Sequence, residues 1–67
     1  MKPFYLSNSS NLRSEGVINQ VLYAKSMEVC LRWASSTGFE VKSIFEIPYD
    51  RPMRDGDLKI DEEGNVI

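Results

Sequence analysis

The chain has 67 residues, of which 42% are hydrophobic and 27% charged, and its formal net charge is −2. This length supports a single domain with a modest core, and the composition is typical of a folded chain. The only cysteine, Cys30, excludes an internal disulfide and, with no secretory leader in the sequence, predicts a cytoplasmic location. The apolar runs are too short to cross a membrane. The acidic balance lacks the basic footprint of nucleic-acid binding, so we expect no direct nucleic-acid contact.

Two strands are predicted ahead of a helix. The first is Phe4–Leu6 with its flanks, which is followed by the polar loop composition of Ser7–Asn11. Glu15-Gly16 then precedes a second run, Val17–Ala24, which is rich in β-branched and aromatic residues. We expect these strands to pair antiparallel across a long loop.

The helix is predicted to begin at Met27 and to end at Gly38. Ser26 can accept the free N–H groups of the first turn through its hydroxyl, and Glu28 favours the positive end of the helix dipole. Gly38 can adopt the left-handed conformation that ends a helix. Helical spacing predicts one buried stripe, widened on one flank by Val29 and Trp33, with these members: Met27, Cys30, Leu31 and Ala34.

A third strand is predicted over residues 39–47, because apolar and charged side chains alternate there. The inward set is Phe39, Val41, Phe45 and Ile47. The outward set, on a face that we expect to be open, is Glu40, Lys42, Ile44 and Glu46. Two prolines then bound a link, and Gly64 suits the positive-φ position of a terminal hairpin.

These elements predict an α+β fold: a small, mostly antiparallel sheet with one helix packed on one face, in the order ββαβ plus a C-terminal hairpin. We divide this single domain, 1–67, into a core over 1–47, a proline- and glycine-containing link over 48–57 and a hairpin over 58–67. One helix covers one face of the sheet, so the opposite face is expected to be open to a partner.

Catalytic chemistry is not indicated. The chain has no histidine, which removes the commonest general base and zinc ligand. Cys30 falls on the predicted buried stripe and is expected to be a core residue. The acidic residues near the C-terminus lack the spacing of a calcium loop, and the four glycines are scattered, so no phosphate-binding loop is predicted. We expect no enzyme activity, no metal and no cofactor.

Six residues are candidates for partner binding. Trp33 lies beside the main stripe, where it could be either a core-edge residue or an interface anchor. Tyr49, Arg51 and Arg54 lie in the proline-bounded link, where solvent exposure is the alternative interpretation. Asp57 and Glu62 belong to an acidic segment that is either a solvated turn or a patch that docks on a basic protein surface.

The arrangement resembles small phage-borne proteins, among them certain anti-CRISPR inhibitors of type I systems, over about residues 1–47. The positions that carry the resemblance are Met1-Lys2, Tyr5, Asn11, Ser14-Glu15-Gly16, Gln20, the Ala24-x-Ser26 entry to the helix, Arg32, Ala34, Val41 and Ile44. The resemblance implies a non-enzymatic inhibitor that binds a host defence complex, most specifically a Cas effector, and blocks target-DNA binding or nuclease recruitment. It transfers no functional residue, because the matching positions are structural. The acidic hairpin departs from those proteins and could instead mimic DNA.

Two other functions stay open at this point. The first is a small cytoplasmic structural or assembly module that self-associates through the open sheet face or an edge strand, so that the protein is either a monomer or a homodimer. The second is an enzyme subunit or nucleic-acid binder, which the missing histidine and the missing basic stripe disfavour.

Overall fold

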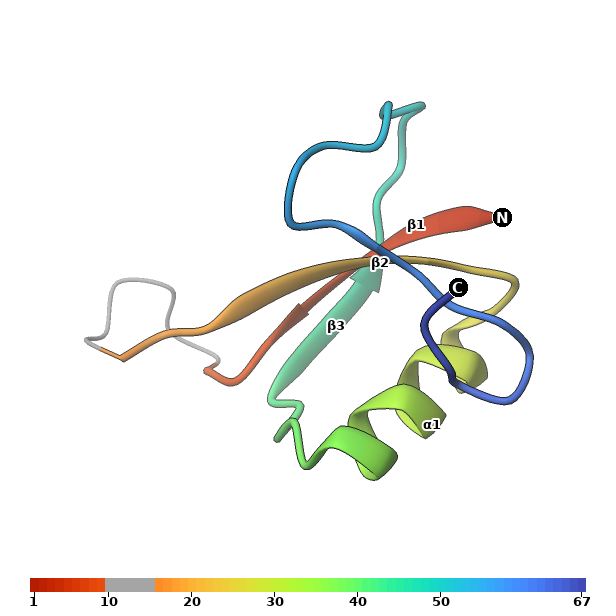
Figure 1. Ribbon diagram of the computed structural model, residues 1–67. Coiled ribbons are helices and arrows are strands. Elements are labelled where there is room, and N and C mark those ends of the chain that lie inside the picture. Colours follow the sequence, from red (N-terminus) through yellow and green to blue (C-terminus); the bar gives the residue numbers. More distant parts are fainter. Residues whose placement is uncertain (10–15) are drawn as a thin grey trace.

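The structure, a computed structural model, describes residues 1–9 and 16–67. Its elements follow the predicted order and confirm the α+β class: β1 (Lys2–Ser7), β2 (Asn19–Ala24), α1 (Met27–Thr37), β3 (Ser43–Glu46) and β4 (Leu58–Lys59) (Figure 1). Part of the predicted polar loop, with Asn11, Ser14 and Glu15, lies outside the described residues.

The four strands form one mixed sheet in the order β3-β1-β2-β4. The predicted antiparallel pairing of β1 with β2 is confirmed, and β1 also pairs antiparallel with β3. The strands β2 and β3 therefore run in the same direction, with β1 between them and α1 connecting them. The short strand β4 pairs parallel with β2 at the other edge.

The predicted ends of α1 are confirmed, but the predicted side-chain cap is not. Gly38 has a φ of 78°, the left-handed conformation, and its N–H donates to the Ala34 carbonyl. Ser26 lies at the N-cap with extended backbone, yet its hydroxyl makes no capping hydrogen bond. The helix start therefore depends on backbone geometry and on the packing of the helix.

The buried face of α1 is rotated from the predicted stripe. Met27 and Leu31 are 38% and 46% exposed, so their predicted burial is wrong. The buried helical residues are Val29, Cys30, Trp33 and Ala34. The rotation has a packing cause: α1 lies over β2, and the C-terminal segment packs beside the Trp33 side of the helix.

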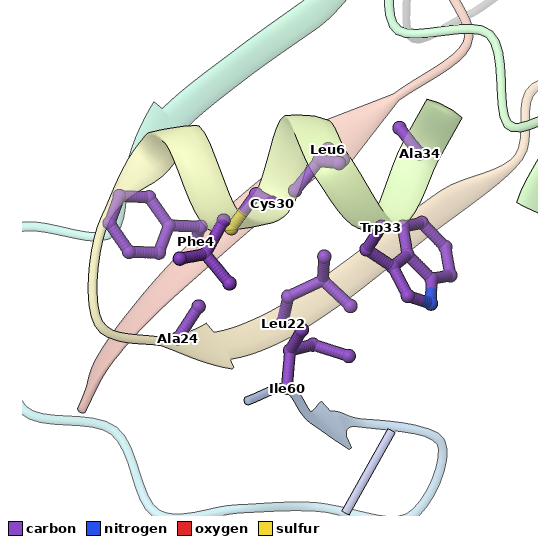
Figure 2. Packing of buried hydrophobic residues seen from close by; sticks show 9 residues of the cluster. Phe4, Leu6, Leu22, Ala24, Cys30, Trp33, Ala34 and Ile60 are labelled. Atoms are coloured by element: carbon purple, nitrogen blue, oxygen red, sulfur yellow. The ribbon is translucent and has the colours of Figure 1, made fainter. Parts of the chain in front are cut away.

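The core lies between α1 and the sheet, and its members come from β1, β2, α1 and the residue after β4: Phe4, Leu6, Leu22, Ala24, Val29, Cys30, Trp33, Ala34 and Ile60 (Figure 2). Ile60 is fully buried beside Leu22. The C-terminal segment therefore belongs to the core.

The predicted terminal hairpin is present as a tight turn. Ile60 and Val66 form an isolated antiparallel bridge, and the Asp61 N–H donates to the Asn65 carbonyl over 2.9 Å. Gly64 has the predicted positive φ, 89°. A Cβ at this position would lie 3.0 Å from the Trp33 backbone nitrogen, so the turn packs directly on α1.

The third strand is shorter than predicted, and its faces are exchanged. Ile44, predicted to face outward, packs against the core, whereas Phe45, predicted to face inward, is 47% exposed. Phe39 and Val41 pack inward as predicted, but residues 39–42 are not in a strand. This irregular segment shifts the alternation by one residue before β3 begins, and a one-residue shift reverses both faces.

The second face of the sheet is partly covered by the link, contrary to the prediction of a fully open face. Tyr23 points away from the helix, because it alternates with the core residues Leu22 and Ala24. Its hydroxyl donates to the carbonyl of Arg51 in the link. Figure 1 shows the link, cyan to blue, on the side of the sheet opposite α1. Tyr23 and Ile47 are both buried outside the helix-side core.

Candidate functional site

The link is held to the sheet by a buried ion pair. The Arg51 guanidinium donates to both carboxylate oxygens of Asp57, and the second contact, from Nη2 to Oδ1, is 3.3 Å. The two side chains are only 9% and 7% exposed. Arg51 also donates to the Tyr23 hydroxyl over 3.2 Å, and Asp57 accepts from the Arg54 N–H over 2.9 Å. These contacts close the segment from Arg51 to Asp57 and join it, through Arg51, to Tyr23 of β2.

The charges of this pair stabilise each other. The hydrogen bond from Arg51 is the main cause that lowers the pKa of Asp57 from its ordinary value of 3.8. The same hydrogen bond, with a second to Tyr23, raises the pKa of Arg51 further. Both groups are therefore ionised under all physiological conditions, and bidentate geometry fixes their orientation.

The exposed side chains of the link include Tyr49, Met53 and Arg54. Tyr49 is 63% exposed and Met53 is 48% exposed. We call these three residues the link surface. Tyrosine, methionine and arginine are all enriched at protein interfaces. Arg51, Asp57 and Tyr23 fix the backbone between residues 51 and 57, so Met53 and Arg54 are presented on an ordered loop, and Tyr49 lies two residues before it.

A hollow of about 450 Å³ lies beside Tyr49. It is formed where the start of β1 meets the end of β3 and the first residues of the link, and its lining is Met1, Lys2, Pro3, Glu46, Ile47, Pro48, Tyr49 and Asp50. Tyr49 thus lies at the rim of a concave surface, which could accept a side chain of a partner.

Trp33 lies on the other side of the sheet from the link surface. It is 7% exposed, belongs to the helix-side core and packs at 5.5 Å from the ring of Phe39. This burial supports the core-edge interpretation of Trp33. Its remaining exposed edge lines a second hollow with Ile18 and Thr37, among other residues.

Glu62 is exposed but already engaged within the chain. Its carboxylate lies 2.5 Å from the Lys25 ammonium, and its carbonyl accepts from Arg32 over 2.7 Å. The Lys25 contact lowers the pKa of Glu62 and raises that of Lys25. Glu62 therefore joins the C-terminal turn to α1 and is separate from the link.

Of the six predicted candidates, Tyr49 and Arg54 thus offer free side chains on one loop. Arg51 and Asp57 form the ion pair that holds the link to β2, a role that the sequence interpretation missed. It also missed Met53, although its place between Arg51 and Arg54 in the same link was a usable signal.

Other chemistry-bearing groups add no second site. Across residues 1–9 and 16–67 no three metal-ligating side chains come together. Burial raises the pKa of the Cys30 thiol to about 11, so this thiol is unreactive at neutral pH. No helix within the described part of the chain is long and apolar enough to cross a membrane.

Comparisons of the chain with protein-family models, with curated proteins and with solved structures found no match. The functional proposal therefore depends on the contacts and surfaces of this chain.

Proposed function

We propose that this protein acts by stoichiometric binding to another protein through the link surface, without catalysing a reaction. The specific function that we propose is inhibition of a host defence complex, with a CRISPR-Cas effector as the first partner to test. Binding would block either the entry of target DNA or the recruitment of a nuclease.

The observation that carries the binding proposal is the buried Arg51–Asp57 pair within a link that exposes an aromatic and a basic side chain. A loop that is ordered before it binds loses less conformational freedom on association than a mobile one. The exposed tyrosine and arginine of the link are residue types that dominate binding energy at interfaces. A surface of this kind favours recognition of a partner over turnover of a substrate.

The charges around the link surface indicate the chemistry of the partner. Asp50 directly follows Tyr49 and Asp55 directly follows Arg54, and both aspartates are exposed. Arg54 lies between them in sequence as an exposed cation. A partner with basic side chains around an apolar pocket, and one acidic group opposite Arg54, would complement this arrangement. Lysine-rich DNA channels of nucleases and effector complexes have the required positive charge.

The proposal can be tested by adding the purified protein to crRNA-guided effectors of several types and measuring target-DNA binding. We expect DNA affinity to fall with at least one effector. In the variant Tyr49→Ala/Arg54→Ala, inhibition should weaken at least about tenfold, because two interface anchors are lost.

The matched control is Leu31→Ala/Lys59→Ala, which also removes one exposed apolar and one exposed basic side chain, from α1 and β4. It should inhibit as the unmodified protein does. Unchanged DNA affinity with every effector would refute the inhibitor function. Full inhibition by the Tyr49→Ala/Arg54→Ala variant would instead refute the link surface as the binding site.

A further inference from the structure

We propose that a second copy of this chain pairs with the outer edge of β3, antiparallel and around a two-fold axis at Phe45. The pairing would join two four-stranded sheets into one continuous sheet. It uses β3 and its flanks, not the link surface, and it does not depend on the proposed inhibitor function.

The backbone of β3 provides the first argument. Its inner side pairs with β1, and the Ile47 N–H donates to the carbonyl of Pro3, the residue directly opposite. In an antiparallel pair the amides alternate in direction, so Phe45 faces β1 while Ile44 and Glu46 face away. No other described strand pairs with that outer side. The edge therefore presents free donors and acceptors at Ile44 and Glu46.

Self-pairing around Phe45 satisfies these groups. In this register Ile44 of one copy lies opposite Glu46 of the second copy, and the reverse pair is identical by symmetry. Both are pairs in which the two residues exchange their N–H and carbonyl bonds. A two-fold axis at Phe45 thus uses every outward-facing amide of Ile44 and Glu46.

The side chains of the second sheet face support the same register. Phe45 stacks on Tyr5 at a ring distance of 5.1 Å, yet it remains 47% exposed. With the axis at Phe45, this ring lies directly opposite its own copy, in a pair whose Cα atoms are only about 4.5 Å apart. The two Tyr5–Phe45 stacks then form one aromatic row, which covers the exposed ring.

Charge complementarity removes the usual obstacle to edge pairing. Like charges on an edge strand prevent self-association. Here Lys42 precedes β3 and Glu46 ends it, so antiparallel pairing places the positive start of one strand near the negative end of its copy. At present these two side chains contact Glu40 and Lys2, at 2.8 Å and 3.9 Å, and all four side chains are at least 48% exposed.

The helix leaves room for the second copy. The main packing of α1 is on β2, on the far side of β1 from β3. Figure 1 shows β3 as the strand at the free edge of the sheet. Two copies can therefore approach along β3 with their helices apart on the same side of the joined sheet.

Sedimentation equilibrium over a concentration series tests this interface. We expect a reversible dimer of the 7.7 kDa chain. The variant Phe45→Asp places two carboxylates opposite each other and should weaken dimerisation at least about tenfold. The matched control Tyr49→Asp changes another exposed aromatic residue and should dimerise normally. Circular dichroism establishes that both variants are folded.

Crosslinking tests the register independently of stability. Phe45→Cys should form a disulfide-linked dimer under mild oxidation much faster than Tyr49→Cys, since Cys30 is buried and unreactive. A monomer throughout the concentration series, a dimer that survives Phe45→Asp, or equal crosslinking of both cysteine variants would overturn the proposal. These results leave the effector-binding assay unaffected, so the two proposals fail separately.

Discussion

At the scale of single residues, the Arg51–Asp57 pair shows how a charged sequence segment can serve the fold. Asp57 lies among acidic residues that look like a solvated turn, yet it is nearly buried beneath the link. Buried ion pairs need further hydrogen bonds to be tolerated, and the Tyr23 hydroxyl and the Arg54 N–H provide them. The pair therefore holds the link against β2.

The Arg51–Asp57 ion pair should make the free energy of unfolding depend on pH in the acidic range. The folded pKa of Asp57 is lowered, so its contribution is fully present above the unfolded value near 3.8 and is lost as the pH falls through the lower folded value. We expect the urea concentration at the unfolding midpoint to decrease when the pH is lowered below about 4. In Asp57→Asn the midpoint should be lower at neutral pH, because Arg51 loses its counter-charge, and its acid-dependent fall should be smaller.

The control for this measurement is Asp50→Asn, which removes an exposed carboxyl of the same link. It should keep both the neutral midpoint and the acid-dependent fall. An Asp57→Asn variant with the same pH profile as the unmodified protein would show that the ion pair does not hold the link.

At the scale of elements, α1 packs against the C-terminal turn as well as against the sheet. Gly64 packs against the backbone of Trp33 and the side chain of Arg32, and Ile60 fills the core from the same segment. This contact explains why the buried face of the helix is turned toward Trp33 and away from Leu31.

Two glycine substitutions separate the effects of backbone strain and of crowding at this contact. Gly56 and Gly64 both have positive φ, 92° and 89°. A Cβ at Gly56 meets nothing within 4 Å, whereas one at Gly64 meets the Trp33 nitrogen at 3.0 Å. We expect Gly56→Ala to cost about 1–2 kcal/mol from conformation alone. Gly64→Ala should cost about 2–4 kcal/mol, because overpacking adds to the strain.

Urea unfolding followed by circular dichroism measures both costs. Equal losses in the two variants would mean that the turn moves away from α1 without resistance. A larger loss in Gly56→Ala would contradict the packing of Gly64 on the helix.

Local signals predicted the ends of elements better than their faces. Met27 and Gly38 were correct as helix limits because capping positions and glycine conformation act over a few residues. The burial of Met27 and Leu31 was wrong because the cover provided by Ile60 comes from thirty residues later in the chain. The faces of β3 were exchanged because the irregular segment at 39–42 changes the phase of alternation, which no local pattern reveals.

At the scale of the whole molecule, Trp33 joins the parts into one core. It contacts Phe39 after the helix, belongs to the cluster with Leu22 of β2, and its backbone supports the C-terminal turn. A chain of this size has one core, so the loss of any of these contacts should release the others.

Trp33 fluorescence and far-ultraviolet circular dichroism should therefore report the same urea transition. Coincident midpoints and slopes are expected for a two-state domain. Fluorescence that changes at lower urea than the helical signal would show that the C-terminal turn separates from α1 before the domain unfolds. The measurement needs no substitution, because Trp33 is the only tryptophan.

The candidate site could be predicted from the sequence only in part. The prolines and the coincidence of Tyr49, Arg51 and Arg54 indicated the link as a candidate for partner contact. Which side chains of the link are buried and which are exposed depends on Tyr23, which is twenty-eight residues from Arg51 in sequence. Exposure of Tyr49 and Arg54 and burial of Arg51 follow from that distant contact, which spacing alone does not contain.

The interior position of β1 has a consequence for how the chain is made. Its two neighbours are β2, which follows soon, and β3, which is complete only at Glu46, while β4 ends at Lys59. During translation the interior strand β1 is therefore made first, and the edge strands β3 and β4 are made last. The complete native sheet cannot form until residue 59 has been translated, and until α1 has been made the apolar side of β1 stays exposed to chaperones.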